Sequence, residues 1–531
     1  MRGFGHRRLS RRALLRSSAS LVAGSFVLGR KSTAEARAGS AVQVLVHDEV
    51  QDSAAFQRGR HLGTTVRADL LQGTGVFESE PIVSPFAFTH VGLHWRGNFP
   101  AGSFEVRTSP DGLIWSGWIS LHIEVVSDQA PAGDTFASLV AASRDNYLQY
   151  RTTLAQGQSL NRVTATFLNS YDAPTIATST AASVTKPAFV DISREEWGCD
   201  ESLRFDRRGR EIWPRMYVPV KKLVVHHTAG RNDYTPETAA FEVNAVYTYH
   251  ARTQGWGDIG YHVLIDRFGR SYEGRYSRDL ASGREVCSPD VVAGHALAHN
   301  YGSFGVALVG EFESTYAASA SDTLKDLNPP EVMLSRLADV LAFRAAERQI
   351  DPYGVSHFLK SDGTWNDWLP NISGHKDTFG TLCPGDLIYA RLGAIRDAVS
   401  ARLTLGAAPV FLSGPEGGPS NPSQSIGTVT FTWAPGEEVT PEEAAEYRYY
   451  LEGWYKSSAS EAVTYLSGFT SDRYPLWSDW TTETSRTYTG LGDGHYTMHL
   501  LRRDGSGMTL ETNRTMLLSG VNSPGKKPPR R

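Results

Sequence analysis

The stretch GHKDTFGTLC, residues 374–383, places a histidine and a cysteine on one segment that has the composition of an irregular loop. His375 and Cys383 are eight positions apart, a spacing that lets a loop return both side chains to one metal ion. Imidazole nitrogen and thiolate sulfur are the ligands that zinc prefers, and a catalytic zinc takes three protein ligands and an open position for water. The stretch therefore predicts a zinc loop that needs one more ligand from elsewhere.

The missing ligand is predicted in KLVVHHTAG, residues 222–230, where an apolar, mostly β-branched run indicates a buried strand. The run ends in two histidines, His226 and His227. Because successive side chains of a strand point to opposite faces, only one of the two can easily face the metal.

Helix and strand patterns alternate around these two stretches. The length of 531 residues suggests three or four domains of about 150 residues each. The expected elements of the central region are helices at 236–253, 331–349 and 386–403 and strands at 222–227, 261–266, 271–274 and 306–309. This alternation predicts an α/β domain with a mixed β-sheet and flanking helices.

Both flanking regions show the period-two alternation of antiparallel strands, as in Leu93 and Trp95 and again in Phe431 and Trp433. The first region predicts an all-β sandwich or jelly roll, and the second resembles a fibronectin- or immunoglobulin-like β-sandwich. The expected order is a signal peptide at 1–38, a β domain at 39–170, a linker at 171–190, the α/β domain at 191–405, a β-sandwich at 406–520 and a basic tail at 521–531.

The first 38 residues resemble a twin-arginine export signal. Arg11 and Arg12 precede an apolar run at 21–28, and small residues at Ala36 and Ala38 allow cleavage before Gly39. This predicts a secreted, extracellular or wall-associated protein. Nine Lys and Arg stand against one acidic residue in this segment, so its removal changes the formal charge from −4 to −12.

An acidic mature chain without a basic stripe predicts no nucleic-acid partner. No later apolar run reaches the length of about 20 residues that spans a bilayer, which predicts no transmembrane segment in the mature chain.

Four blocks occur in an order that resembles peptidoglycan recognition proteins and the phage-lysozyme-like zinc amidases, the N-acetylmuramoyl-L-alanine amidases. They are VVHHTAG, GWGDIGYH, AGHALAHNYGSFGVALVG and GHKDTFGTLCPGD. The resemblance covers about residues 192–405. It implies zinc-dependent hydrolysis of the amide between N-acetylmuramic acid and L-alanine in peptidoglycan, for cell-wall degradation or remodelling. Peptidoglycan is then the expected partner, and the flanking β domains are candidates for binding wall polymers.

The resemblance also implies roles for particular residues. The implied zinc ligands are His226, His375 and Cys383. Tyr261 is implied to lie beside the metal-bound water, and Thr381 to stand where members of the family carry threonine or lysine. Two further histidines are implied to lie near the substrate, His295 in the groove and His227 on the other side of its strand.

The chemistry of these residues leaves alternatives open. Tyr261 could take or relay a proton, and Thr381 could donate to a developing oxyanion. Taken singly, packing is the favoured role for Tyr261 and capping for Thr381. The alternative function is a noncatalytic peptidoglycan-binding protein with a structural zinc, and a third is a structural wall component. Cys383 and Tyr261 favour the enzyme. A disulfide between Cys199 and Cys287 is left open by the sequence.

Replacement of Arg11 and Arg12 by lysine tests the export prediction. Because the twin arginines are the feature that marks this export route, we expect the double variant to accumulate as an uncleaved precursor in the cytoplasm. Fractionation of cells and immunoblotting measure this. Unchanged secretion of the double variant would contradict the assignment, and an Arg7→Lys, Arg8→Lys chain is the matched control.

Overall fold

The computed structural model describes residues 40–98, 103–123, 133–177, 185–279, 286–315, 326–361, 364–405, 409–414, 423–424, 428–436, 445–455, 478–489, 494–504 and 507–519. The chain divides into two compact units, 1–36 and 37–531. The predicted signal peptide, the basic tail and the middle of the predicted linker lie outside the described residues.

The N-terminal part of the second unit is built from antiparallel strands and one short helix, α2 (Ser53–Arg58). Four strands pair in a closed cycle: β4 pairs with β10 and β9, and β5 pairs with the same two strands. Alternate residues of β5, among them Val91, Leu93 and Trp95, are fully buried in the core. Whether this layer is a sandwich or a jelly roll stays a prediction. The strands are β1 (Ser40–Val42), β2 (Leu45–Gln51), β3 (Arg60–Arg67), β4 (Leu70–Glu78), β5 (Ile82–Asn98), β6 (Ser103–Ser109), β7 (Ile119–Ser120), β8 (Thr135–Phe136), β9 (Val140–Leu154), β10 (Ser159–Asn169) and β11 (Thr175–Ala177).

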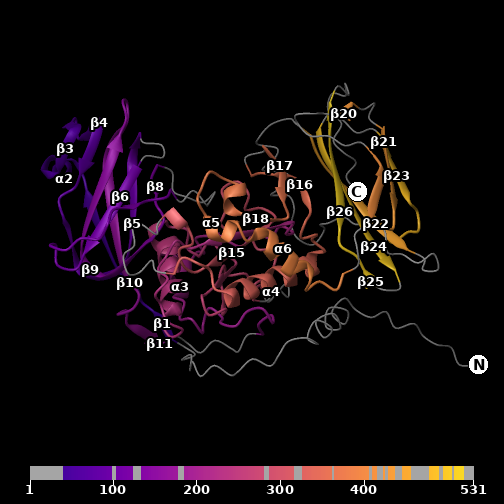
Figure 1. The fold of residues 1–531 in the computed structure, drawn as a ribbon, viewed down its shortest axis with the longest axis horizontal. Coiled ribbons are helices and arrows are strands. Elements are labelled where there is room, and N and C mark those ends of the chain that lie inside the picture. Colours follow the sequence, from indigo (N-terminus) through magenta and orange to yellow (C-terminus); the bar gives the residue numbers. More distant parts are fainter. Residues whose placement is uncertain are drawn as a thin grey trace, which may run out of the picture. The chain divides into compact units, whose positions relative to one another are not determined.

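The central domain contains the predicted mixed sheet, with strand order β14-β13-β15-β12-β18 (Figure 1). β12 (Lys222–His227) runs parallel to β15 (Ser303–Leu308) on one side and to β18 (Ile372–Gly374) on the other. β13 (Val263–Ile265) is parallel to β15 and antiparallel to β14 (Ser271–Glu273). The mixed sheet is thereby confirmed, although Tyr261 precedes its strand instead of opening it.

The helices differ from the prediction at their ends. α3 is Ala239–Thr248 and continues as a π-helical segment, Tyr249–Thr253, and it begins three residues later than expected because Thr235 starts a turn instead. α4 (Glu331–Arg348) matches the expected span. The last predicted helix is broken into α5 (Asp386–Tyr389) and α6 (Leu392–Ser400). The Asp386 carboxylate accepts hydrogen bonds from the Ser314 backbone and hydroxyl, which fixes α5 separately from α6.

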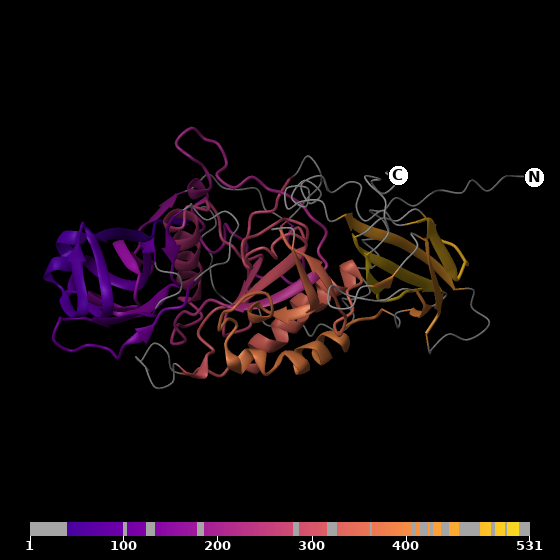
Figure 2. The same cartoon turned by 90° about the horizontal axis from the view of Figure 1, so that it is seen from above.

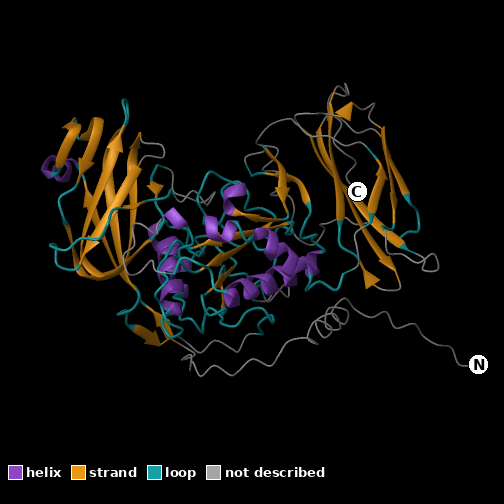
Figure 3. Cartoon of the chain, viewed as in Figure 1, coloured by secondary structure: helices purple, strands orange, loops and turns teal. Residues whose placement is uncertain are grey.

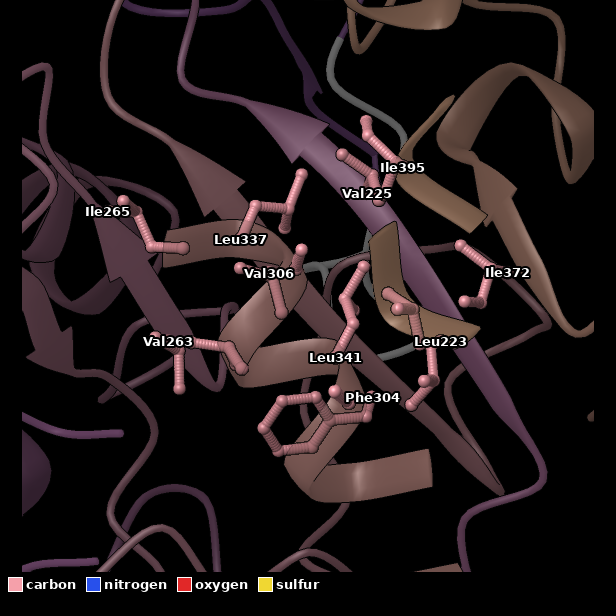
Figure 4. Packing of buried hydrophobic residues seen from close by; sticks show 14 of the residues in the cluster. Leu223, Val225, Val263, Ile265, Phe304, Val306, Leu337, Leu341, Ile372 and Ile395 are labelled. Carbon is pink, nitrogen blue, oxygen red and sulfur yellow. The ribbon is translucent and has the colours of Figure 1, made fainter. Parts of the chain in front are cut away.

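Helices cover both faces of this sheet (Figures 2 and 3). Figure 4 shows Leu223 and Val225 of β12 packed with Leu337 and Leu341 of α4. α3 packs on the opposite face, against residues such as Leu264 and Ala307. Since side chains alternate along a strand, His226 points to the α3 face and His227 to the α4 face. Each fully buried aliphatic side chain contributes about 1.5–3 kcal/mol to stability, so the register of β12 is strongly fixed.

The C-terminal part consists of two sheets that share a core. Val429, Phe431 and Trp433 of β21 pack with Tyr449 and Met498 from the second sheet. Its resemblance to fibronectin or immunoglobulin domains stays a prediction. The first sheet contains β19 (Val410–Ser413), β21 (Thr428–Ala434) and β23 (Ser485–Thr489), and the second β20 (Ser423–Gln424), β22 (Glu446–Tyr455), β24 (Gly494–Asp504), β25 (Gly507–Met508) and β26 (Thr512–Ser519). A separate hairpin, β16 (Val355–Leu359) with β17 (Trp365–Pro370), belongs to the central region. Among the residues in the described ranges, no helix is both long and apolar enough to cross a membrane.

Cys199 and Cys287 are free thiols in different surroundings. The Cys199 sulfur accepts a hydrogen bond from Arg194 at 3.0 Å, whereas the Cys287 thiol donates to the His262 carbonyl at 3.6 Å. Burial raises the pKa of the Cys287 thiol to about 12. The structure therefore holds two separate, protonated thiols in place of the disulfide that the sequence left open.

A buried charge cluster links the start of the central domain to the segments on either side of Tyr261. The Asp258 carboxylate accepts hydrogen bonds from Arg194 at 2.8 Å and from Arg275 at 2.7 Å, and all three side chains are almost wholly buried. Burial alone would raise the pKa of Asp258, but the two guanidinium groups outweigh it and lower the pKa to about 2.

Asp258→Asn should destabilise the protein by about 3–5 kcal/mol, because it leaves two buried arginines without their anionic partner. Urea denaturation of the full chain measures this. Asp206→Asn is the control, because Asp206 pairs with an exposed arginine, Arg210, and solvent screens such a pair. Because the folded pKa lies below the ordinary value of 3.8, the contribution of Asp258 is present above about pH 4 and is lost as the pH falls toward 2. Equal effects of the two variants would contradict the cluster's importance.

Candidate metal centre

Strand pairing brings two of the predicted ligands together. The parallel register of β12 and β18 ends with Val225 opposite Gly374, so His226 and His375 come next to each other at the carboxyl ends of the two strands. The centroids of the two imidazole rings are 4.5 Å apart. Carboxyl ends of parallel strands are the usual place for ligand sites in α/β sheets.

The loop after His375 supplies the third side chain. The Lys376 amide donates to the Cys383 carbonyl at 2.9 Å, which closes the loop on itself. The Cys383 sulfur lies 3.7 Å from His226 Nδ1. Ligand atoms of His226, His375 and Cys383 all lie within 4.8 Å of one another. The structure thus gathers the three predicted metal ligands in one place.

The electrostatics of the two histidines fit a metal ion. His226 is completely buried, and burial together with His375 and His295 holds its pKa well below the ordinary value. Burial also lowers the pKa of His375 to about 3. Both rings are therefore neutral and offer a lone pair, as metal binding requires. His375 Nε2 is buried without a hydrogen-bond partner, a state that costs about 1–3 kcal/mol unless the atom finds a ligand.

His295 occupies a different place from the one that the resemblance implied. Its side chain is completely buried, with Nδ1 3.0 Å from His226 Nε2 and Nε2 3.2 Å from the Ser303 hydroxyl. The groove-lining role of His295 stays a prediction, and its contact with His226 is one that can orient the His226 ring. Ser303 was missed by the sequence reasoning, because a serine at the start of a strand carries no distinguishing signal.

His227 points to the other side of β12, as the alternation of side chains predicted, and its role toward the substrate stays a prediction. Its side chain is 5% exposed, and Nδ1 lies 3.3 Å from Glu311 Oε1. Its backbone nitrogen donates to the Cys383 sulfur at 3.4 Å. Glu311 was likewise missed, although its position just after a parallel strand beside β12 was a usable signal.

Tyr261 and Thr381 flank the three ligands. The buried Tyr261 ring lies 5.3 Å from the His226 ring and 5.6 Å from the His250 ring. Thr381 is half-buried on the loop, and its hydroxyl oxygen accepts a hydrogen bond from the Cys383 amide at 3.2 Å. This contact lies within the loop and caps no helix, because the N-cap of α5 is Gly385, and it leaves the Thr381 hydroxyl proton available to another acceptor.

This region of the chain matches a known protein family. Residues 216–386 fit the family model of N-acetylmuramoyl-L-alanine amidases, and the matched span includes every candidate residue above. The central domain belongs to this family. The expected resemblance is confirmed.

Two curated relatives illustrate the match. Peptidoglycan recognition protein 1 of Bos taurus is 27% identical over 200 residues, which are 37% of this chain and 80% of the relative. N-acetylmuramoyl-L-alanine amidase of Homo sapiens is 29% identical over 178 residues, which are 33% of this chain and 24% of that longer protein. Among solved structures, a Drosophila PGRP-LB variant in complex with tracheal cytotoxin is 21% identical, covers 38% of this chain and 92% of its own, and has a TM-score of 0.27.

His295→Ala should weaken zinc binding by about 10–100-fold, because the partner that orients a ligating histidine tunes metal affinity. Competition between the protein and a chromophoric chelator measures this affinity directly. His499→Ala is the control, since His499 is equally buried but lies in the C-terminal sheet beside Glu511. An unchanged affinity in His295→Ala would contradict the positioning role.

Proposed function

We propose that this protein is an exported, zinc-dependent N-acetylmuramoyl-L-alanine amidase that hydrolyses the amide between N-acetylmuramic acid and L-alanine in peptidoglycan. The observation that carries the proposal is the convergence of His226, His375 and Cys383 within 4.8 Å inside a segment that matches this amidase family. A bound zinc would supply an activated water and polarise the scissile carbonyl.

The chain's own residues would then hold and complete that centre. Two neutral imidazoles and one thiolate leave a divalent ion with net positive charge, which suits an electrophilic role. His295 holds the His226 ring through their 3.0 Å contact. We assign proton transfer or orientation of the attacking water to Tyr261, and stabilisation of the developing oxyanion to the Thr381 hydroxyl.

The ligand count favours catalysis over a purely structural zinc. Structural zinc sites are almost always closed by four protein ligands, whereas catalytic sites have three. Three side chains gather here among the described residues, and the Cys383 side is partly open to solvent. A noncatalytic peptidoglycan-binding protein is the competing proposal, since a relative is named a peptidoglycan recognition protein. The flanking β domains are proposed as spacers or as modules that bind wall polymers.

Tyr261→Phe separates catalysis from binding. The ring and its packing remain, so zinc content and binding to purified sacculi should stay unchanged, while loss of a general acid–base group should reduce turnover by about 10²–10⁴-fold. Release of new L-alanine amino termini from sacculi measures turnover. Tyr353→Phe, at a tyrosine that is 54% exposed, is the control.

Cys383→Ser completes the experiment. It should lose both zinc and activity, because a hydroxyl replaces the thiolate ligand. Wild-type protein that binds zinc and sacculi but releases no amino termini would sink the amidase proposal in favour of the binding protein. Full activity of Tyr261→Phe would sink only the role of Tyr261.

A further inference from the structure

The end of α3 carries a buried histidine, His250, that lies close to Tyr261. The helix continues there as the π-helical segment Tyr249–Thr253, in which the Gln254 amide donates to the Tyr249 carbonyl at 2.9 Å, five positions back. Only 2% of His250 is exposed. Single π-helical turns inside helices are frequent at functional sites. The place of His250 in such a turn directs attention to what its ring contacts.

The His250 ring packs on two aromatic rings. The centroid of its imidazole lies 5.6 Å from that of Tyr261 and 4.7 Å from that of Trp256. The Tyr261 ring in turn lies 5.3 Å from the His226 ring. Tyr261 thus has a candidate metal ligand as one neighbour and His250 as another.

A hydrogen bond joins the same ring to the backbone immediately before Tyr261. The Gly260 amide donates to His250 Nδ1 at 3.2 Å. An imidazole that accepts at Nδ1 carries its proton on Nε2, so the contact also fixes the tautomer of His250. A buried backbone N–H needs an acceptor, and His250 supplies it for Gly260.

Three hydrogen bonds hold the backbone at this point. Besides the contact with His250, the Gly260 carbonyl accepts from the Gly294 amide at 3.1 Å, and the Tyr261 carbonyl accepts from the Arg275 amide at 2.7 Å. A side chain at Gly260 would not fit, since its Cβ would lie 2.5 Å from the Gly294 carbonyl oxygen. Of the three contacts, only the one with His250 comes from a side chain, so a substitution can remove it alone.

We propose that His250 is a positioning residue for Tyr261. Through the Gly260 amide and through ring packing, it sets where the Tyr261 hydroxyl lies relative to the candidate metal centre. His250 is not among the three gathered ligands, so its effect on the reaction passes through Tyr261. The inference rests on the proposed function, because it depends on the role assigned to Tyr261. A catalytic group displaced by about 1 Å can lose about 100-fold in rate.

The test separates the acceptor atom of His250 from its aromatic ring. His250→Asn keeps an oxygen near the place of Nδ1, whereas His250→Phe keeps a ring and removes the acceptor. On purified sacculi, the full-length, zinc-loaded His250→Phe chain should have a kcat lower by about 10–100-fold, with KM and zinc content unchanged. His250→Asn should stay within about 3-fold of the wild type. Full turnover in His250→Phe, or an equal loss in both variants, would overturn the inference.

A double variant identifies the residue through which His250 acts. If the effect passes through the Tyr261 hydroxyl, His250→Phe should cause no further loss of kcat in the Tyr261→Phe chain. The same fold loss in both backgrounds would overturn the inference. Tyr247→Phe is the matched control on α3, because it removes the hydrogen bond from the Tyr247 hydroxyl to the Asp200 carbonyl and should keep full turnover.

His250→Gln covers the case in which phenylalanine prevents folding. The glutamine amide reaches the place of Nε2 and leaves the Gly260 amide without its acceptor, so this variant should lose turnover as His250→Phe does. Turnover of His250→Gln equal to that of His250→Asn would contradict the role of the Nδ1 contact.

Hydrogen exchange at the Gly260 amide, followed by mass spectrometry, needs no enzymatic activity. Exchange should be about 10-fold faster in His250→Phe and His250→Gln than in the wild type and His250→Asn, because the two former chains lack the acceptor. If this pattern appears but the wild type releases no amino termini, the amidase proposal fails and the positioning of the backbone at Tyr261 stands. If the wild type is active and exchange is equal in every chain, the positioning inference fails and the amidase proposal stands.

Discussion

The parallel pairing of β12 with β18 is the constraint on which the candidate site depends. The two strands lie about 150 positions apart in the chain, and their register sets His226 beside His375. Packing of α4 and α6 on one face of the sheet fixes that register, because a shift by one residue would place His226 among the aliphatic side chains of that face and remove Val225 from them. A metal centre built on strand ends is thus stabilised by the hydrophobic core beneath it.

Two kinds of buried polar cluster stand close together in this domain. The histidines around His226 are neutral, because burial and their mutual repulsion oppose protonation. Asp258 keeps its charge at the same depth because Arg194 and Arg275 contact it directly. The neutral histidines offer lone pairs to a cation. The charges around Asp258 pair with one another and stabilise the fold. Direct charge pairing, and not burial, decides which cluster can bind a ligand.

The family match accounts for the central domain only, and the N-terminal strands contact that domain through α3. The buried contacts of Glu242 with His90 and Tyr171 make α3 the anchor for that region. α3 also packs against the sheet that carries His226, so this helix contacts both regions.

The sequence by itself determined the mixed sheet, the loop with His375 and Cys383, and the family. These follow from local properties: ligand chemistry, spacing along one loop, and the periodicity of apolar residues. Alternation along a strand predicted that only one of His226 and His227 could face the metal, and the family resemblance implied His226. The physical reason for that choice came from the tertiary structure, since it depends on which face α4 covers. The same holds for the contact between His295 and His226, which lie 69 positions apart in the chain. Packing between remote segments decided these positions, and no local pattern encodes it.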